Sequence, residues 1–253
     1  MNATLSVDGH VALLTLENSP LNIITAGMRP HLVAAITKVA ADPEIRALVV
    51  TGAGERAFCA GADLNEEADL TPETVRRFLD DDCEIYDGLE NLPIPVIAAI
   101  NGHCMGGGLE LALSCDIRVA ADDALLRAAG VRVGLVVSTT RMTRLAGPAV
   151  AKDVILTGRT FTGAEAKSLG IVARSVPRAD VLTTAMDTAR EIAGRAPLAV
   201  RRAKQAIGEA LDLPYAEAME RELQHFAELS ATEDHKHAIA AFFARQTPQF
   251  KGR

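Results

Sequence analysis

The pattern of apolar and polar residues predicts paired strands at the start of the chain. Short β-branched runs at Thr4–Val7 and Val11–Leu16 flank an Asp-Gly pair, which favours a tight hairpin turn. Apolar residues then recur at helical spacing over residues 26–39. The run Ala47–Thr51 has the Val and Leu content of a short buried strand. The sequence therefore predicts a hairpin, a helix and a buried strand in this order.

A strand, a glycine-containing turn and a helix recur through the middle of the chain. Thr71-Pro72-Glu73 predicts the start of a helix that runs to about Leu92, with Thr71 as its cap. Buried strands are expected at Pro95–Ile100 and Ile117–Ala120, with a helix at Gly107–Cys115 between them. This recurrence indicates an α/β fold in which helices pack on sheets.

The last part of the sequence is expected to be helical. Strand signals cease after about Arg190, and helical patterns follow at residues 199–210, 215–229 and 232–243. We therefore expect an α/β core at residues 1–195 and a helical C-terminal segment at residues 196–253.

Composition and charge argue against several classes of protein. The chain has 253 residues, of which 49% are apolar and 4% aromatic, with no tryptophan. Its net charge is −7 and it has no basic run longer than Arg201-Arg202, so a nucleic-acid partner is not expected. The four cysteines form no C-x-x-C pair, and His235-x-His237 does not share a helical face, so we expect no metal site.

The sequence also gives an expectation about location. The first sixteen residues lack a charged segment followed by an apolar one, and the apolar stretch at residues 93–100 is too short to span a bilayer. We therefore expect a cytoplasmic protein without a membrane partner.

Two segments have the residue types of an anion-binding turn. They are Ala57–Leu64, which follows a predicted strand and a glycine turn, and Asn101–Glu110, which follows a predicted strand. Glycine lets the backbone approach a ligand closely, and the first amides of a helix have no partner within it. Two such amides aimed at one carbonyl oxygen form an oxyanion hole.

Taken alone, a glycine run before a helix usually marks only a tight turn. Gly106-Gly107-Gly108 is not followed by the Lys and Ser/Thr of a phosphate-binding loop. It does not form a dinucleotide-binding G-x-G-x-x-G pattern either.

The two segments together resemble the signature blocks of the enoyl-CoA hydratase/isomerase (crotonase) superfamily. The blocks are Phe58-Cys59-Ala60-Gly61-Ala62-Asp63-Leu64 and Asn101-Gly102 with Gly106-Gly107-Gly108, Glu110 and Asp116. The resemblance continues through Thr157-Gly158-Arg159 to the closing Pro248-x-Phe250, over nearly the whole chain.

This resemblance implies a fold, a substrate and a site. It implies a spiral of ββα units with a helical C-terminal trimerisation segment, assembled as trimers or pairs of trimers. The substrate is a coenzyme A thioester, with no permanently bound cofactor, and the oxyanion hole consists of the amides of Ala62 and Gly107. The resemblance places the following residues at the coenzyme A, the last two in a neighbouring subunit: Ala60, Gly61, Asp63, Leu64, Gly106, Gly108, Phe242 and Arg245.

The resemblance implies a catalytic carboxylate at Glu110, but the second glutamate of family hydratases is missing. Its position falls on Gly130, and the glycine-rich loop that follows is shortened to Ser138-Thr139-Thr140. Glu110 can instead be a carboxylate that only complements its helix N-terminus. A positioned acid or base typically contributes about 10²–10⁴-fold in rate, so hydration by two carboxylates is in question.

Several outcomes stay open at this point. Glu110 can move a single proton, as in double-bond isomerisation, or hydrate a favourable substrate slowly. The oxyanion hole can serve decarboxylation or C–C cleavage, as in some branches of the family, or the chain can bind acyl-CoA without turnover. Residues that can replace the lost acid, although each is more often structural, are Glu66, Glu67, Arg127, Arg132 and Ser138.

Overall fold

The computed structural model describes residues 2–253 and contains a six-stranded sheet with the order β1-β2-β3-β5-β7-β10. Only the hairpin strands β1 and β2 are antiparallel, and the other neighbours pair in parallel. Strands β3 and β5 are buried along their whole length, which matches their continuous apolar sequence. The strands are β1 (Asn2–Asp8), β2 (Val11–Glu17), β3 (Ala47–Gly52), β5 (Val96–Ile100), β7 (Ile117–Ala121) and β10 (Arg174–Val176).

A second, smaller sheet has the order β4-β6-β8-β9. Its first three strands are parallel and the last pair is antiparallel. Each of these strands has only two or three residues, too few for a periodic pattern to reveal them. They are β4 (Ala57–Cys59), β6 (His103–Met105), β8 (Leu125–Arg127) and β9 (Phe161–Thr162).

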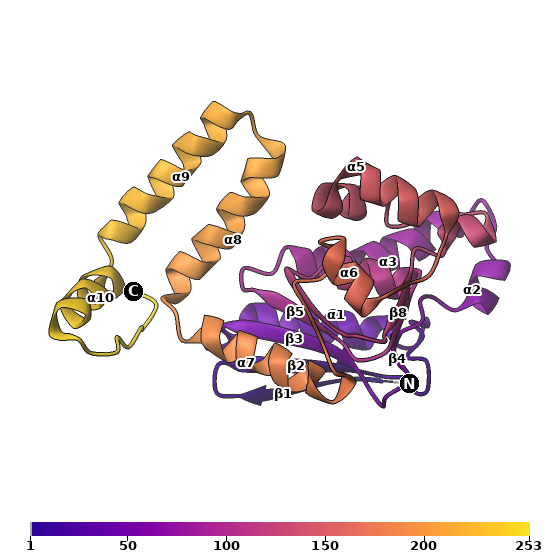
Figure 1. Cartoon of the computed structure of the whole chain (residues 1–253), viewed down its shortest axis with the longest axis horizontal. Coiled ribbons are helices and arrows are strands. Elements are labelled where there is room, and N and C mark those ends of the chain that lie inside the picture. Colours follow the sequence, from indigo (N-terminus) through magenta and orange to yellow (C-terminus); the bar gives the residue numbers. More distant parts are fainter. Residues whose placement is uncertain (1) are drawn as a thin grey trace.

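The two sheets arise from one repeated unit. The pairs β3/β4, β5/β6 and β7/β8 each contribute one strand to each sheet before the chain continues into helices. Helices surround the two sheets (Figure 1). They are α1 (Arg29–Ala41), α2 (Leu64–Ala68), α3 (Val75–Glu90), α4 (Gly107–Leu113), α5 (Thr139–Thr157), α6 (Gly163–Ser168) and α7 (Val181–Ala193).

The predicted hairpin, central strands and α4 are confirmed, but two helix starts are wrong. Helix α1 begins at Arg29 because Pro30 follows, and proline lacks the N–H that an earlier turn would use. Helix α3 begins at Val75 instead of at the predicted Thr71 cap. The Thr74 hydroxyl accepts a hydrogen bond from the Thr71 amide at 2.9 Å, which closes a separate turn before the helix.

Three helices, α8 (Pro197–Asp212), α9 (Tyr215–Ser230) and α10 (Glu233–Ala244), extend away from the α/β body (Figure 1). We call residues 197–253 the C-terminal arm. Asp116 anchors it, since its Oδ2 accepts from Lys204 Nζ at 2.8 Å and from the Val96 amide at 2.7 Å. A groove of about 660 Å³ separates α8 from the end of α3 and from Arg144 of α5.

Within residues 2–253, none of the helices combines the length and the apolar character needed to cross a bilayer.

Candidate active site

The two glycine-containing turns lie at one edge of the small sheet. Strands β4 and β6 are parallel, with Ala57 beside His103 and Cys59 beside Cys104. Parallel neighbours end at the same edge of a sheet, so the turns that follow them must emerge together. This topology brings residues 60–63 and 106–108 to one place.

Backbone hydrogen bonds fix the direction of the Ala62 amide. Ala62 forms a parallel bridge with Ile24, in which the Ile24 amide donates to Gly61 and the Asp63 amide donates to Ile24. These bonds use the groups on either side of Ala62, so its own N–H faces away from Ile24. A further bond from the Ala60 amide to the Leu21 carbonyl holds the start of this loop.

The Gly107 amide lies beside that of Ala62. Gly107 is the first residue of α4, where an N–H has no acceptor in its own helix. A Cβ built on Gly107 would lie 3.4 Å from the Ala62 nitrogen, and one built on Gly61 would lie 3.3 Å from the Gly107 nitrogen. The nitrogens of the two amides therefore lie near each other.

Glycine is required at three positions of these turns. Gly61 and Gly106 have φ values of +107° and +51°, which residues with a Cβ rarely adopt. Gly108 is required for space, because a Cβ there would lie 2.0 Å from the Cys59 carbonyl oxygen. The close approach of α4 to β4 depends on this missing side chain.

The surroundings of the turns contain no ionised thiol or phenol. Burial raises the pKa of the Cys59 thiol to about 12 and the pKa of Cys104 well above its ordinary value. Burial likewise raises the pKa of Tyr86, whose hydroxyl would lie 2.9 Å from a Cβ on Gly107. These groups stay protonated, so they do not supply a nucleophile.

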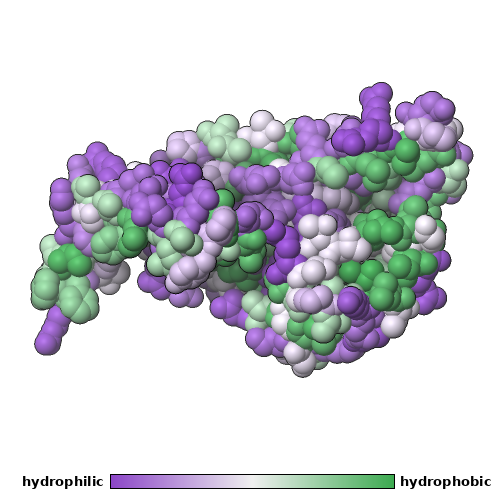
Figure 2. Space-filling model, turned by 90° about the horizontal axis from the view of Figure 1, so that it is seen from above, coloured by the Kyte–Doolittle hydropathy of each residue, from purple (hydrophilic) through white to green (hydrophobic). Residues whose placement is uncertain are grey.

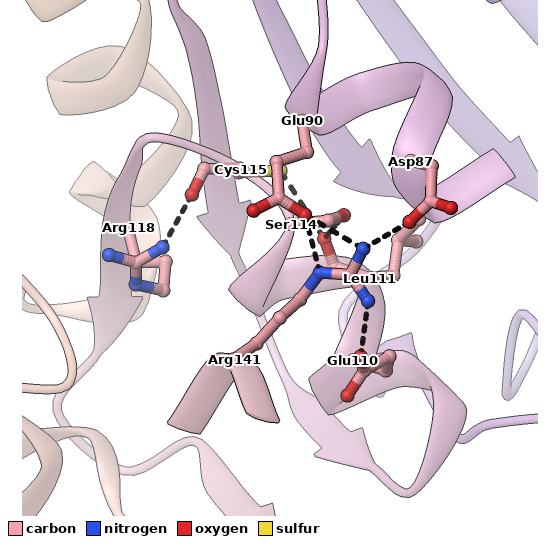
Figure 3. A network of polar contacts seen from close by, with 8 residues as sticks. All are labelled: Asp87, Glu90, Glu110, Leu111, Ser114, Cys115, Arg118 and Arg141. Atoms are coloured by element: carbon pink, nitrogen blue, oxygen red, sulfur yellow. Dashed lines mark hydrogen bonds and ion pairs between the residues drawn. The ribbon is translucent and has the colours of Figure 1, made fainter. Parts of the chain in front are cut away.

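Glu110 lies one turn after Gly107, and its side chain is buried. Its Oε1 accepts from Arg141 Nη1 at 2.5 Å, whereas its Oε2 is buried without a partner among the described residues. Arg141 also contacts Asp87 and Glu90 of α3, at 2.5 and 2.7 Å (Figure 3). One oxygen of Glu110 is thus occupied and the other is free.

Gly130, where the resemblance expects a second glutamate, lies in a tight turn. The chain folds onto this residue, because the Leu135 amide donates to the Gly130 carbonyl and closes a short 3₁₀ helix, Gly130–Val133. A Cβ on Gly130 would lie 2.8 Å from the Leu135 carbonyl oxygen and 3.0 Å from Val137 Cγ1. The space that a larger side chain needs is taken by this turn.

Two of the residues considered as substitutes have structural partners. Glu66 accepts from Arg29 Nη1 and from the Ala26 amide, both at 2.7 Å. Arg127 donates to Thr160 Oγ1. Ser138 is different, since it is buried with φ of +64° and its hydroxyl has no partner among the described residues. Glu66 and Arg127 are thus held by structural contacts, whereas the Ser138 hydroxyl is not.

The expected coenzyme A residues separate into two groups. Ala60, Gly61 and Leu64 lie beside the turns, and the Leu64 side chain is 61% exposed. Asp63 caps α2 through a 2.9 Å bond from the Asn65 amide to its carboxylate. Phe242 and Arg245 belong to the C-terminal arm at the far end of the molecule, where Phe242 is 76% exposed (Figure 1).

Sequence reasoning missed Arg141 and Tyr86. Arg141 lies in the first turn of α5, where the helix dipole makes a positive charge unfavourable. This unfavourable position is the one local feature that indicates a partner outside the helix. Its partners stand 31 to 54 positions away in the sequence, so no spacing rule could identify them. Tyr86 follows the helical period of α3 and reads only as a core residue.

Among residues 2–253, no group of three or more His, Cys, Asp or Glu side chains is arranged to hold a metal ion.

Comparison with known proteins identifies the class. The family model described as enoyl-CoA hydratase/isomerase matches residues 7–253. The chain is 38% identical over 250 residues to a probable enoyl-CoA hydratase of Mycobacterium tuberculosis, covering 97% of this chain and 96% of that one. It is 36% identical to the short-chain-enoyl-CoA hydratase of Clostridium acetobutylicum, covering 100% and 98%.

Solved structures agree with these sequence matches. The crystal structure of an enoyl-CoA hydratase from Bacillus anthracis superimposes with a TM-score of 0.96 at 35% identity, over the whole of both chains. The α/β fold with its two sheets and helical C-terminal arm is thus the crotonase fold. The chain belongs to the enoyl-CoA hydratase/isomerase family, and it is an acyl-CoA-processing enzyme of that type.

Proposed function

We propose that this enzyme holds the thioester oxygen of an enoyl-CoA between the amides of Ala62 and Gly107 and uses Glu110 to transfer a proton. The observation that carries this proposal is the side-by-side placement of the two amides, with Glu110 one turn further along α4. Two preorganised donors stabilise the charge that develops on a thioester oxygen, and removing one such donor typically costs about 3–4 kcal/mol.

The single carboxylate favours double-bond isomerisation. Glu110 removes a proton from C2 of a 3-enoyl thioester, and the electron pair of that C–H bond moves toward the carbonyl carbon. The resulting dienolate carries its negative charge on the oxygen held by Ala62 and Gly107. Glu110 then returns the proton to C4, which leaves a conjugated 2-enoyl thioester and the original carboxylate.

Hydration is the second candidate function, and the names of the relatives favour it. In hydration, Glu110 takes a proton from water while the water oxygen adds to C3, and C2 must then be protonated. Gly130 offers no acid for that second transfer. We therefore expect hydration to be slower than isomerisation.

Coenzyme A is expected to contact the residues that flank the oxyanion hole. In this proposal the loop Ala60–Leu64, with Gly106 and Gly108, lines the pantetheine and adenine. Phe242 and Arg245 of a neighbouring subunit complete the site, since both lie on the exposed end of the C-terminal arm. The coenzyme enters as part of the substrate, with no permanently bound cofactor.

We expect the enzyme to assemble into a trimer, or a pair of trimers, through the arm. Helices α8 and α9 bury no apolar side chain within the chain, and α10 buries only Ala241. Figure 2 shows apolar residues on this arm as well as on the α/β body. Uncovered apolar surface of this extent favours contact with further copies. The exposed residues of the arm include Ile207, Leu211, Tyr215, Leu223, Phe226, Phe242 and Phe243.

We also propose that the enzyme acts in the cytoplasm. All four cysteines are free thiols, which suits a reducing compartment.

A panel of thioesters tests the proposed reaction. We expect a 3-enoyl-CoA to be converted to the conjugated 2-enoyl-CoA faster than the 2-enoyl-CoA is hydrated, with both products followed by liquid chromatography. Exchange of the C2 proton of a saturated acyl-CoA with deuterium reports the enolate step separately. Binding of every thioester without exchange or product would contradict the proposal, as would turnover of malonyl-type thioesters alone.

A further inference from the structure

Arg141 is held by three carboxylates from two helices. Its Nη1 donates to Glu110 of α4, and its other nitrogens donate to Asp87 and Glu90 of α3 (Figure 3). The Glu110 and Arg141 side chains are only 10% and 16% exposed, whereas those of Asp87 and Glu90 are 58% and 48% exposed. The contact with Glu110 is therefore the one most shielded from water.

This contact restricts what Glu110 can do. The guanidinium occupies Oε1 and keeps a permanent positive charge beside the carboxylate, since arginine does not lose its proton in proteins. Burial alone would lower the pKa of Arg141. The hydrogen bond and charge contact with Glu110, together with Glu90, outweigh burial and raise this pKa above its ordinary value.

We propose that Arg141 is a positioning residue that fixes the orientation of the Glu110 carboxyl group and leaves one of its oxygens free. The inference rests on the proposed function of Glu110 and adds the group that orients it. Asp87 and Glu90 brace the guanidinium from α3, so the Glu110 side chain cannot rotate without breaking a buried ion pair. The free Oε2 is the oxygen that receives the substrate proton.

The position of Arg141 in the chain supports this role. Three residues before it, Ser138 has a left-handed backbone and begins α5 directly after the turn that closes on Gly130. The segment that has Gly130 in place of an acid therefore also contains Arg141, the cation that pairs with Glu110. Arg144 lies one turn later on the same helix and instead pairs with Asp212 of the arm at 2.7 Å.

Replacement of Arg141 by alanine, followed by rescue with guanidinium, tests the proposal. We expect kcat for the enoyl-CoA substrate to fall about 10²-fold, with KM changed less than about threefold, because misplacing a catalytic group by about 1 Å costs this much. Guanidinium at non-denaturing concentrations should restore at least a tenth of the parent kcat in a saturable manner. Equal concentrations of urea or sodium chloride should restore nothing.

Matched variants separate positioning from general stability. Arg144→Gln removes the same charge from the next turn of α5 and should leave kcat within about twofold of the parent. Arg141→Lys keeps a cation and should exceed Arg141→Met in kcat at least tenfold. If the alanine variant does not fold, the comparison of lysine with methionine still tests whether Arg141 positions Glu110.

Two results would overturn the inference while leaving the proposed function intact. One is a kcat for Arg141→Ala within about threefold of the parent while Glu110→Gln is inactive. The other is a loss that guanidinium does not reverse and that lysine and methionine share equally. Full turnover by Glu110→Gln would overturn the proposed function itself.

Discussion

Replacing Glu110 with glutamine is expected to lower kcat about 10²–10⁴-fold, the usual contribution of a positioned acid or base. Glutamine keeps the size of the side chain and can still accept from Arg141 through its amide oxygen. It cannot take up the substrate proton, so the rates of isomerisation and of C2 proton exchange should both fall by this factor. Stopped assays with a 3-enoyl-CoA would measure this loss.

Binding should survive this substitution, because the oxyanion hole consists of backbone amides. Titration calorimetry with butanoyl-CoA, a saturated thioester, should give a Kd within about threefold of the parent. A suitable control is Glu191→Gln, which removes a carboxylate of α7 from its exposed ion pair with Arg195. Turnover by Glu110→Gln at the rate of the parent would contradict the catalytic role. It would indicate that the Glu110 carboxylate only complements the N-terminus of its helix.

Replacing Gly108 with alanine should have the largest structural effect. The new Cβ would lie 2.0 Å from the Cys59 carbonyl oxygen and 2.7 Å from its carbon, so α4 must move away from β4. Overpacking of this kind typically costs about 1–3 kcal/mol of the free energy of unfolding or more. The movement also separates the Gly107 amide from Ala62, so activity should fall by at least the contribution of one donor, about 10²–10³-fold.

The matched control for this change is Gly208→Ala in α8. Nothing lies within 4 Å of a Cβ built there, and the residue is exposed on a helix. Alanine should stabilise it by about 0.5–1 kcal/mol. The Tm and kcat should thus both fall for Gly108→Ala. For Gly208→Ala they should stay equal to those of the parent or rise slightly. A Gly108→Ala variant with the parent's Tm and kcat would contradict the described packing.

The sequence predicted the parts of the fold that carry long patterns. The hairpin follows from β-branched runs around an Asp-Gly pair, the buried strands β3 and β5 from continuous apolar runs, and the helical arm from helical spacing. The small sheet was not predictable in this way, because β4, β6 and β8 have three residues each. The pairing of β4 with β6 is a tertiary event, yet it decides where both glycine turns lie.

The sequence indicated where the chain needs glycine, but it did not indicate which distant side chains meet. Gly61, Gly106 and Gly108 were identifiable because positive φ values and close approach exclude other residues. The absence of an acid at Gly130 was also readable. The contact between Arg141 and Glu110 could not be predicted from the sequence, because it joins two helices through side chains alone.

A crystal structure of Glu110→Gln with a bound enoyl-CoA tests most directly whether the amides of Ala62 and Gly107 both bind the thioester oxygen. The account predicts that the thioester oxygen lies about 2.7–3.1 Å from the nitrogens of both Ala62 and Gly107. A thioester oxygen more than about 4 Å from either nitrogen, or one held by side chains instead, would contradict it.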